Sequence, residues 1–265
     1  METQVKRPII RVRGTQHEAV EDTIVTEHAV TVKINQQEFV TMVCTPEYVE
    51  DMVLGYLASE RIIRTYADID RLWYQEKEGV VHVETTKLNP YARDVQNKRY
   101  ITSCCGMSRQ GFVFASDALA AKQMDEVHVT VTPEDCYRLM RMMQQEAVTF
   151  KETGGVHNAA LCDANGIIVS RMDIGRHNAL DKLYGYCIQR HIPVRNKVLI
   201  FSGRISSEIL IKAAKIGVGV ILSKSAPTTL AVTLAQDLNI TAIGFIRDGN
   251  FNIYSHPERI TPVET

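Results

Sequence analysis

Residues 197–246 read KVLIFSGRISSEILIKAAKIGVGVILSKSAPTTLAVTLAQDLNITAIGFI, and their pattern of apolar runs and turns indicates the fold class. Three apolar runs rich in β-branched residues are typical of buried strands: 197–201, 218–222 and 240–246. Helical segments are expected between them, near 206–216 and 227–238. Strands that alternate with helices indicate parallel pairing in a layered sheet. The stretch therefore predicts an α/β fold.

The same pattern starts near residue 155, with a hairpin whose expected turn is Asp163-Ala164-Asn165-Gly166. A helix should precede this hairpin and start at residue 133, because Thr132 is a suitable N-cap and Pro133 follows at the first helical position. We therefore expect two domains: residues 131–265 as the α/β domain and residues 1–130 as a smaller module.

The smaller module has the pattern of a β-rich α+β unit. Residues 24–44 alternate between apolar and polar side chains around a turn at 35–37, which predicts an antiparallel pair. Thr45 as N-cap and Pro46 at the first helical position predict a helix next. Short strands near residues 73 and 80–83 complete the expected sheet.

Composition excludes several classes of protein. The chain has 265 residues, 45% of them hydrophobic, and a formal net charge of −1 from 30 basic and 31 acidic residues. Because no long block carries one sign of charge, neither nucleic acid nor an anionic membrane is an expected partner. No signal peptide is evident and the apolar runs are too short to span a bilayer, so we expect a cytoplasmic protein. Its six scattered cysteines should be reduced.

Each of the three predicted parallel strands ends in a polar, turn-forming group. The groups are Ser202-Gly203-Arg204, Ser223-Lys224-Ser225 and Arg247-Asp248-Gly249-Asn250. The carboxyl ends of parallel strands meet at one crevice, where the following helices offer unpaired N–H groups to an anion. This edge is therefore a predicted phosphate-binding site. Each of its cations, taken alone, is more often a solvated surface charge than a ligand, so the prediction rests on the coincidence of three strand ends.

Two adjacent cysteines, Cys104 and Cys105, lie between small and polar residues in the sequence Thr-Ser-Cys-Cys-Gly-Met-Ser-Arg at 102–109. A thiol reacts as its thiolate, which an open setting near a cation such as Arg109 favours. The simpler interpretation is that these thiols fill the core, as most free cysteines do. The neighbouring glycine and serines favour the reactive interpretation.

Two further stretches contain histidines beside glycine and asparagine, at His157 and at His177. Such a histidine could move protons, or it could brace a loop by hydrogen bonding, and the sequence leaves both roles open. The chain has neither a His-x-Glu with Pro-Cys-x-x-Cys nor paired zinc-ligand spacing. We therefore expect no metal site.

Several of these segments resemble one known family, the FdhD proteins, which are formate dehydrogenase accessory sulfurtransferases. The resemblance extends from about Glu38 to the C-terminus. It rests on four motifs besides LGYLASERII at 54–63: TGGVH at 153–157, DIGRHNALDK at 173–182, SAPTTLAV at 225–232 and YSHPERI at 254–260.

The resemblance implies a three-layer fold like that of cytidine deaminase, without its zinc. It also implies that sulfur passes from a cysteine desulfurase to the molybdenum bis(molybdopterin guanine dinucleotide) cofactor, which formate dehydrogenase then receives. Cys105 matches the family's persulfide carrier, whereas Ser108 replaces the second cysteine of the usual Cys-Gly-x-Cys loop. A homodimer is a further implication of the family.

The family's cofactor contacts fall on the last core strand and the turn after it: Phe245, Ile246, Arg247, Asp248, Gly249 and Asn250. Two other functions remain open. A non-catalytic chaperone could bind the cofactor and dock it to the dehydrogenase, and a zinc-free deaminase-like enzyme could act on a free nucleotide.

Overall fold

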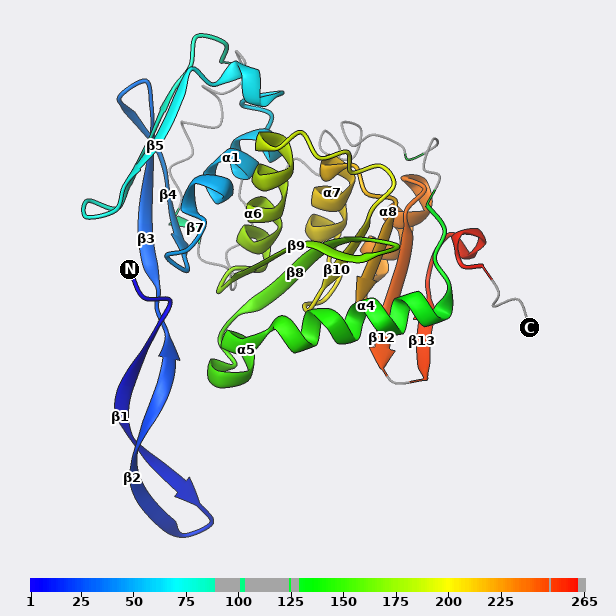
Figure 1. The fold of residues 1–265 in the computed structure, drawn as a ribbon, viewed down its shortest axis with the longest axis horizontal. Coiled ribbons are helices and arrows are strands. Elements are labelled where there is room, and N and C mark those ends of the chain that lie inside the picture. Colours follow the sequence, from blue (N-terminus) through cyan, green and yellow to red (C-terminus); the bar gives the residue numbers. More distant parts are fainter. Residues whose placement is uncertain (89–100, 103–123, 125–128, 248, 262–265) are drawn as a thin grey trace.

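A computed structural model describes residues 1–88, 101–102, 124, 129–247 and 249–261. Its larger sheet has six strands in the order β13-β12-β11-β10-β8-β9. Helices α6, α7 and α8 cover one face and α4 covers the other (Figure 1). The strands are β8 (His157–Asp163), β9 (Gly166–Asp173), β10 (Val198–Phe201), β11 (Val220–Ser223), β12 (Thr241–Arg247) and β13 (Asn250–Ile253). The prediction of a three-layer α/β fold is confirmed.

The strand directions follow from the connections. Strands β10, β11 and β12 pair in parallel through α7 (Ser207–Ile216) and α8 (Thr229–Asp237), whereas β8, β9 and β13 pair antiparallel. Gly217 ends α7 in the left-handed conformation, with φ at 101°. The helix on the opposite face, α4 (Pro133–Glu146), starts at the predicted N-cap Thr132, which forms a capping box with Asp135. A short α5 (Val148–Thr153) follows it.

The N-terminal module contains a five-stranded sheet in the order β5-β6-β3-β4-β7. The predicted hairpin is present, and Asn35 and Gln36 at its turn both have positive φ, as a tight hairpin turn requires. The elements are β3 (His28–Ile34), β4 (Gln37–Cys44), α1 (Val49–Ser59), η1 (Tyr66–Asp68), β5 (Arg71–Gln75), β6 (Val80–Glu84) and β7 (Ile101–Thr102).

The predicted start of α1 was wrong. The helix starts at Val49, after a left-handed Tyr48, and not at Pro46. Thr45 caps nothing, because its N–H and hydroxyl both donate to the Asp173 carboxylate, 128 residues away. A distant partner has taken the side chain that would otherwise have capped the helix.

A long ribbon at the N-terminus was not predicted. Strands β1 (Gln4–Arg13) and β2 (Gln16–Val25) pair antiparallel along their whole length and extend away from both sheets (Figure 1). Most side chains of the ribbon are exposed, and no third described strand joins it.

The two sheets are joined through helices α1 and α6 (Arg176–Gln189), which cross with their backbones in contact. An ideal Cβ on Gly55 would lie 1.9 Å from the Asp181 carbonyl oxygen, and one on Gly185 would lie 1.9 Å from that of Asp51. Only glycine allows this approach. This contact joins the N-terminal module to the larger sheet. It does not test the expected domain boundary near residue 130, which stays a prediction.

Candidate functional site

The ends of the three parallel strands meet, as predicted. Ser223 Oγ donates to the Gly203 carbonyl at 2.7 Å, and Ser225 Oγ donates to the Ser202 carbonyl at 3.3 Å. Phe245 N in turn donates to the Ser225 carbonyl at 3.3 Å. The turns after β10 and β11 and the end of β12 therefore form one connected edge of the sheet.

This edge presents positive charge and helix starts. One exposed cation lies at or just after the end of each strand: Arg204, Lys224 and Arg247. Helices α6, α7 and α8 all begin here, which adds the positive end of three helix dipoles. Such an edge can bind phosphate groups through N–H donors and fixed charge.

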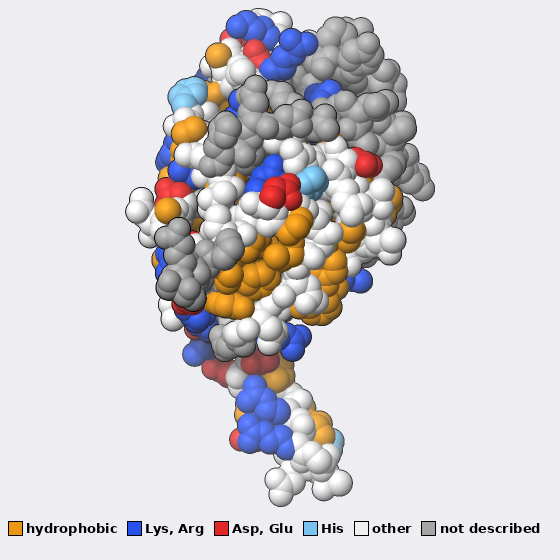
Figure 2. Space-filling view, turned by 90° about the vertical axis from the view of Figure 1, so that its right-hand side faces the viewer, with side chains coloured by type: hydrophobic (Ala, Val, Ile, Leu, Met, Phe, Trp, Pro, Cys, Tyr) orange, Lys and Arg blue, Asp and Glu red, His pale blue; other side chains and the backbone are white. Residues whose placement is uncertain are grey.

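The predicted cofactor contacts occupy different environments. Phe245 and Arg247 are exposed, whereas Ile246 is 1% exposed and packs in the core beneath α4. Phe245 has a positive φ of 55°, in a bulge where the pairing of β12 with β13 shifts. Figure 2 shows the side of the molecule on which the edge strand β13 lies, and apolar side chains gather at the centre of this side. Gly249 and Asn250 are also exposed, and Asp248 lies outside the described residues.

Both histidines singled out in the sequence lie near this edge. The His157 ring stacks on Phe201 with 6.2 Å between centroids, and His177 Nε2 lies 3.0 Å from Glu208 Oε2. Burial lowers the pKa of His157, and the charges of Arg176 and His177 lower it further. Burial is also the main cause that lowers the pKa of His177, against the opposing effect of Glu208. Both rings are therefore mostly neutral at pH 7.

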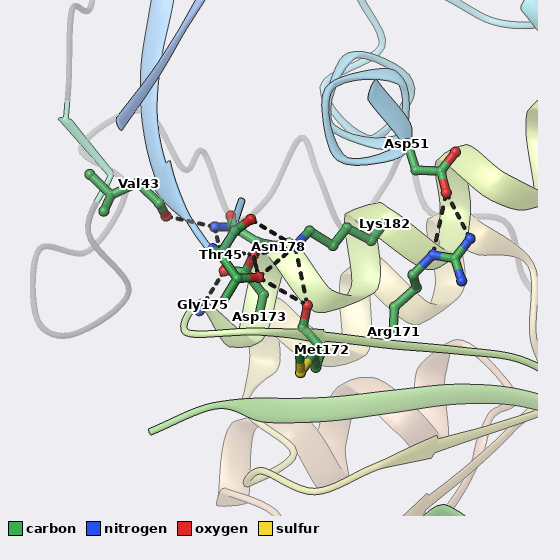
Figure 3. A network of polar contacts seen from close by, with 9 residues as sticks. All are labelled: Val43, Thr45, Asp51, Arg171, Met172, Asp173, Gly175, Asn178 and Lys182. Atoms are coloured by element: carbon green, nitrogen blue, oxygen red, sulfur yellow. Dashed lines mark hydrogen bonds and ion pairs between the residues drawn. The ribbon is translucent and has the colours of Figure 1, made fainter. Parts of the chain in front are cut away.

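The motif at 173–182 forms a buried polar network around the Asp173 carboxylate (Figure 3). Its Oδ2 atom lies 2.7 Å from Lys182 Nζ and accepts hydrogen bonds from Thr45 N at 3.0 Å and Thr45 Oγ1 at 3.1 Å. Its Oδ1 atom accepts from Gly175 N at 2.7 Å and Asn178 Nδ2 at 2.9 Å. Every oxygen of this buried carboxylate is therefore satisfied.

Lys182 and Asn178 extend the network to the N-terminal module. Lys182 Nζ also donates to Thr45 Oγ1 at 2.8 Å and to the carbonyls of Thr45 and Met172, both at 3.2 Å. Asn178 Nδ2 donates to the Val43 carbonyl at 2.9 Å. The motif thus fastens the end of β4 to the start of α6. Sequence reasoning identified these residues only as a family signature and missed this role.

Four of the six cysteines lie in the described part of the chain: Cys44, Cys136, Cys162 and Cys187, and all are buried. Burial raises the pKa of the last three thiols to about 12. Such thiols are protonated and shielded at neutral pH, so they are poor nucleophiles. The candidates from the sequence, Cys104 and Cys105, lie outside the described residues, as do Ser108 and Arg109.

Comparison with known proteins assigns the chain to a family. The model of the FdhD/NarQ family matches residues 25–261. The chain belongs to this family. It is 56% identical over 256 residues to the sulfur carrier protein FdhD of Staphylococcus haemolyticus, covering 97% of this chain and 96% of that protein. It is 54% identical over 258 residues to the protein of the same name from Halalkalibacterium halodurans, covering 97% and 95%.

A solved structure shows the same fold. It is a crystal structure from Desulfotalea psychrophila, of a protein assigned as a formate dehydrogenase accessory protein. The TM-score is 0.80 at 18% identity, and the match covers 98% of this chain and all of the other. Within the described residues of this FdhD-family chain, no helix is both long and apolar enough to cross a membrane.

Proposed function

We propose that this FdhD-family protein carries sulfur for formate dehydrogenase. It accepts a sulfur atom from a cysteine desulfurase as a persulfide on Cys105 and delivers it to the molybdenum bis(molybdopterin guanine dinucleotide) cofactor. Relatives 54–56% identical over nearly the whole chain bear the name sulfur carrier protein, which supports the sulfur-carrying role. In this proposal the cofactor is the substrate, and the dehydrogenase is the protein that receives it.

The position of β7 is the structural observation that carries the proposal. Strand β7 ends at Thr102, which pairs with Met42 of β4, and β4 continues to Val43 and the network at Asp173. Asp173 pairs with His157 across β8 and β9, at the polar edge. Cys105 follows Thr102 by three residues, a span of at most about 11 Å. The chain before the cysteines is therefore anchored beside the site, whereas the four described cysteines are buried.

Loading requires one thiol on this protein. The Cys105 thiolate would attack the outer sulfur of the donor's Cys–S–SH group, the donor's S–S bond would break, and its cysteine would leave as a thiolate. The products are a persulfide on Cys105 and a reduced donor, so sulfur and electrons balance without a second cysteine. Ser108 in place of the family's second thiol is compatible with this chemistry.

Mass spectrometry of the intact protein tests this step. After incubation with a cysteine desulfurase and cysteine, we expect the protein to gain the mass of one sulfur atom, and a reductant to remove it. Cys105→Ala should abolish the gain because it removes the carrier thiol, and Cys104→Ala should retain it. Loading of Cys105→Ala but not Cys104→Ala would contradict the assignment of the carrier. No loading of the folded wild type would favour the non-catalytic chaperone.

The strand-end edge is the proposed site for the guanine nucleotide ends of the cofactor. Arg247→Glu should weaken binding of GDP about tenfold to several hundredfold, because loss of a charge-assisted hydrogen bond costs about 1.5–3 kcal/mol and the new charge repels phosphate. Calorimetry with the folded variant measures this. Arg64→Glu makes the same charge change at an exposed position of the N-terminal module and should leave the affinity unchanged. Equal affinities of both variants for GDP would show that the nucleotide site does not lie at this edge.

A further inference from the structure

Two buried polar atoms at the start of α6 have no hydrogen-bond partner. They are Arg176 Nε and His177 Nε2, on consecutive residues. His177 Nε2 lies 3.0 Å from Glu208 Oε2, yet the two atoms are too poorly aligned for a hydrogen bond. In the described part of the chain, the other buried side-chain atoms without a partner are Gln4 Oε1 and Thr26 Oγ1, at the base of the N-terminal ribbon. A buried donor without an acceptor costs free energy, so two of them together indicate that an acceptor binds at the start of α6.

The backbone and a second ring add to these donors. Helix α6 begins after Gly175, which has no side chain to cap it, so the N–H groups of the first turn are not paired by a cap. The positive end of the helix dipole lies at the same place. Burial, and then the charge of Arg176, lower the pKa of His157, so Arg176 also lies within electrostatic reach of that ring. The start of α6 therefore favours an anion.

The other charges around the start of α6 largely offset one another. Asp173 is paired with Lys182, and Asp181 on the next turn of α6 is paired with Lys212 of α7. Arg176 forms no ion pair with a described residue. Its charge is therefore available to a ligand.

The two buried donors fit a sulfur anion better than a phosphate group. A phosphate is strongly hydrated and needs several donors, which the exposed cations Arg204, Lys224 and Arg247 can supply while water remains. Arg176 Nε and His177 Nε2 offer one N–H each, at atoms that solvent does not reach. A persulfide anion carries a single charge on a weakly hydrated sulfur. Thiolates are stabilised at the start of a helix and beside arginine, which is the arrangement found here.

The proposed carrier cysteine can reach this place. Asn178, in the first turn of α6, donates to the Val43 carbonyl at 2.9 Å, and the neighbouring Met42 pairs with Thr102. Cys105 follows Thr102 by three residues, which span at most about 11 Å. The strand that leads to the cysteine therefore lies beside the start of α6.

We propose that Arg176 and His177 bind the terminal sulfur of the persulfide on Cys105 and stabilise its anion. The inference rests on the proposed sulfur-carrying function and assigns two further residues to it. Binding ionises the group: the S–H bond breaks, its electron pair stays on sulfur and the proton passes to water. No oxidant or reductant takes part. Arg176 supplies a charge and a donor, and the neutral His177 ring supplies a second donor.

The pH dependence of persulfide alkylation tests the proposal. Polysulfide loads an accessible thiol by exchange, so Cys104→Ala protein treated with it should carry the extra sulfur on Cys105. Iodoacetamide then traps the ionised persulfide, and mass spectrometry gives the rate at each pH. Arg176→Met should raise the midpoint of this rate by about one to two pH units, because the anion loses a charge-assisted hydrogen bond. His177→Phe should raise it less, since the lost donor is neutral.

Three features of this experiment separate binding from other effects. Arg176→Lys keeps the charge and should shift the midpoint less than Arg176→Met. Arg141→Met removes a cation from α4, on the opposite face of the sheet, and should leave the midpoint unchanged. The titrating groups nearby, His157, Asp173 and Glu208, stay the same in every variant. A change in access alone scales the rate at every pH and leaves the midpoint where it was. An unchanged midpoint in folded Arg176→Met would overturn the proposal.

Calorimetry with GDP distinguishes this site from the phosphate site. Arg176→Met should leave the affinity for GDP unchanged, because phosphate is assigned to the exposed cations at the strand ends. A weaker affinity for GDP together with an unchanged alkylation midpoint would assign Arg176 to phosphate and overturn the proposal. The proposed function fails separately, when a desulfurase does not load the folded wild type. Polysulfide still loads the thiol in that case, so the midpoint is measured whichever way the enzymatic loading turns out.

Discussion

Gly185→Ala is expected to destabilise this protein strongly. The added Cβ would lie 1.9 Å from the Asp51 carbonyl oxygen and 2.9 Å from Gly55 N, and both atoms belong to the backbone of α1. No side-chain rotation can relieve this contact, so α1 and α6 would have to move apart and open the packing between the two sheets. Overpacking of a core costs about 1–3 kcal/mol and more where backbone must shift, so we expect a loss of about 3 kcal/mol or more. Urea unfolding followed by circular dichroism measures it.

Gly217→Ala provides a control with the same change of side chain. Gly217 has a φ of 101°, and its added Cβ would meet only Val194 Cγ2 at 3.4 Å. The expected cost is the backbone strain alone, about 1–2 kcal/mol. If Gly185→Ala were no more destabilising than Gly217→Ala, the close crossing of α1 and α6 would not be needed for the fold.

The sequence predicted the α/β domain well because its signals are local. Each strand of residues 197–246 is a short apolar run between polar turns, and each helix has its own cap, Ser206 for α7 and Thr228 for α8. The antiparallel pair of β3 and β4 was likewise predicted from period-two alternation and its turn. These signals depend on neighbours in the chain and not on distant contacts.

The errors arose where distant contacts decide the structure. Thr45 has the pattern of a helix cap, yet Asp173 binds it from 128 residues away. The β1–β2 ribbon escaped prediction because the burial alternation that marks a strand requires a covered face, and most of the ribbon's side chains remain exposed. Its register became visible only from the structure.

The candidate site was predicted in part. The meeting of the three strand ends follows from parallel topology alone and is confirmed. Ile246 was included among the cofactor contacts by resemblance, but it faces the core beneath α4. Periodicity could have suggested this burial, since alternate residues of β12 face opposite sides of the sheet.

The motif at 173–182 connects the fold to the proposed function. Asp173 and Lys182 hold the end of β4, and β4 pairs with β7, after which the chain leads to the two cysteines. A second buried pair on the same helix joins Asp181 to Lys212 of α7 at 2.5 Å, and Ser59 of α1 donates to the same carboxylate at 3.0 Å. Helix α6 therefore links the N-terminal module, the polar edge and α7.

Lys182→Met should destabilise the protein by about 3–5 kcal/mol, because it leaves the Asp173 carboxylate buried without its countercharge. Both side chains are fully buried and their charged atoms are 2.7 Å apart. Asp173→Asn combined with Lys182→Met should cost less than the sum of the two single changes, since the double variant contains no unpaired buried charge. Arg141→Met is the control, because its ion pair with Glu134 is exposed and should contribute about 0–1 kcal/mol. Urea unfolding of the four variants and the wild type gives each cost. Additive costs for Asp173 and Lys182 would show that the two groups do not act as a pair, and the link between β4 and α6 would then depend on the hydrogen bonds of Thr45 and Asn178 alone.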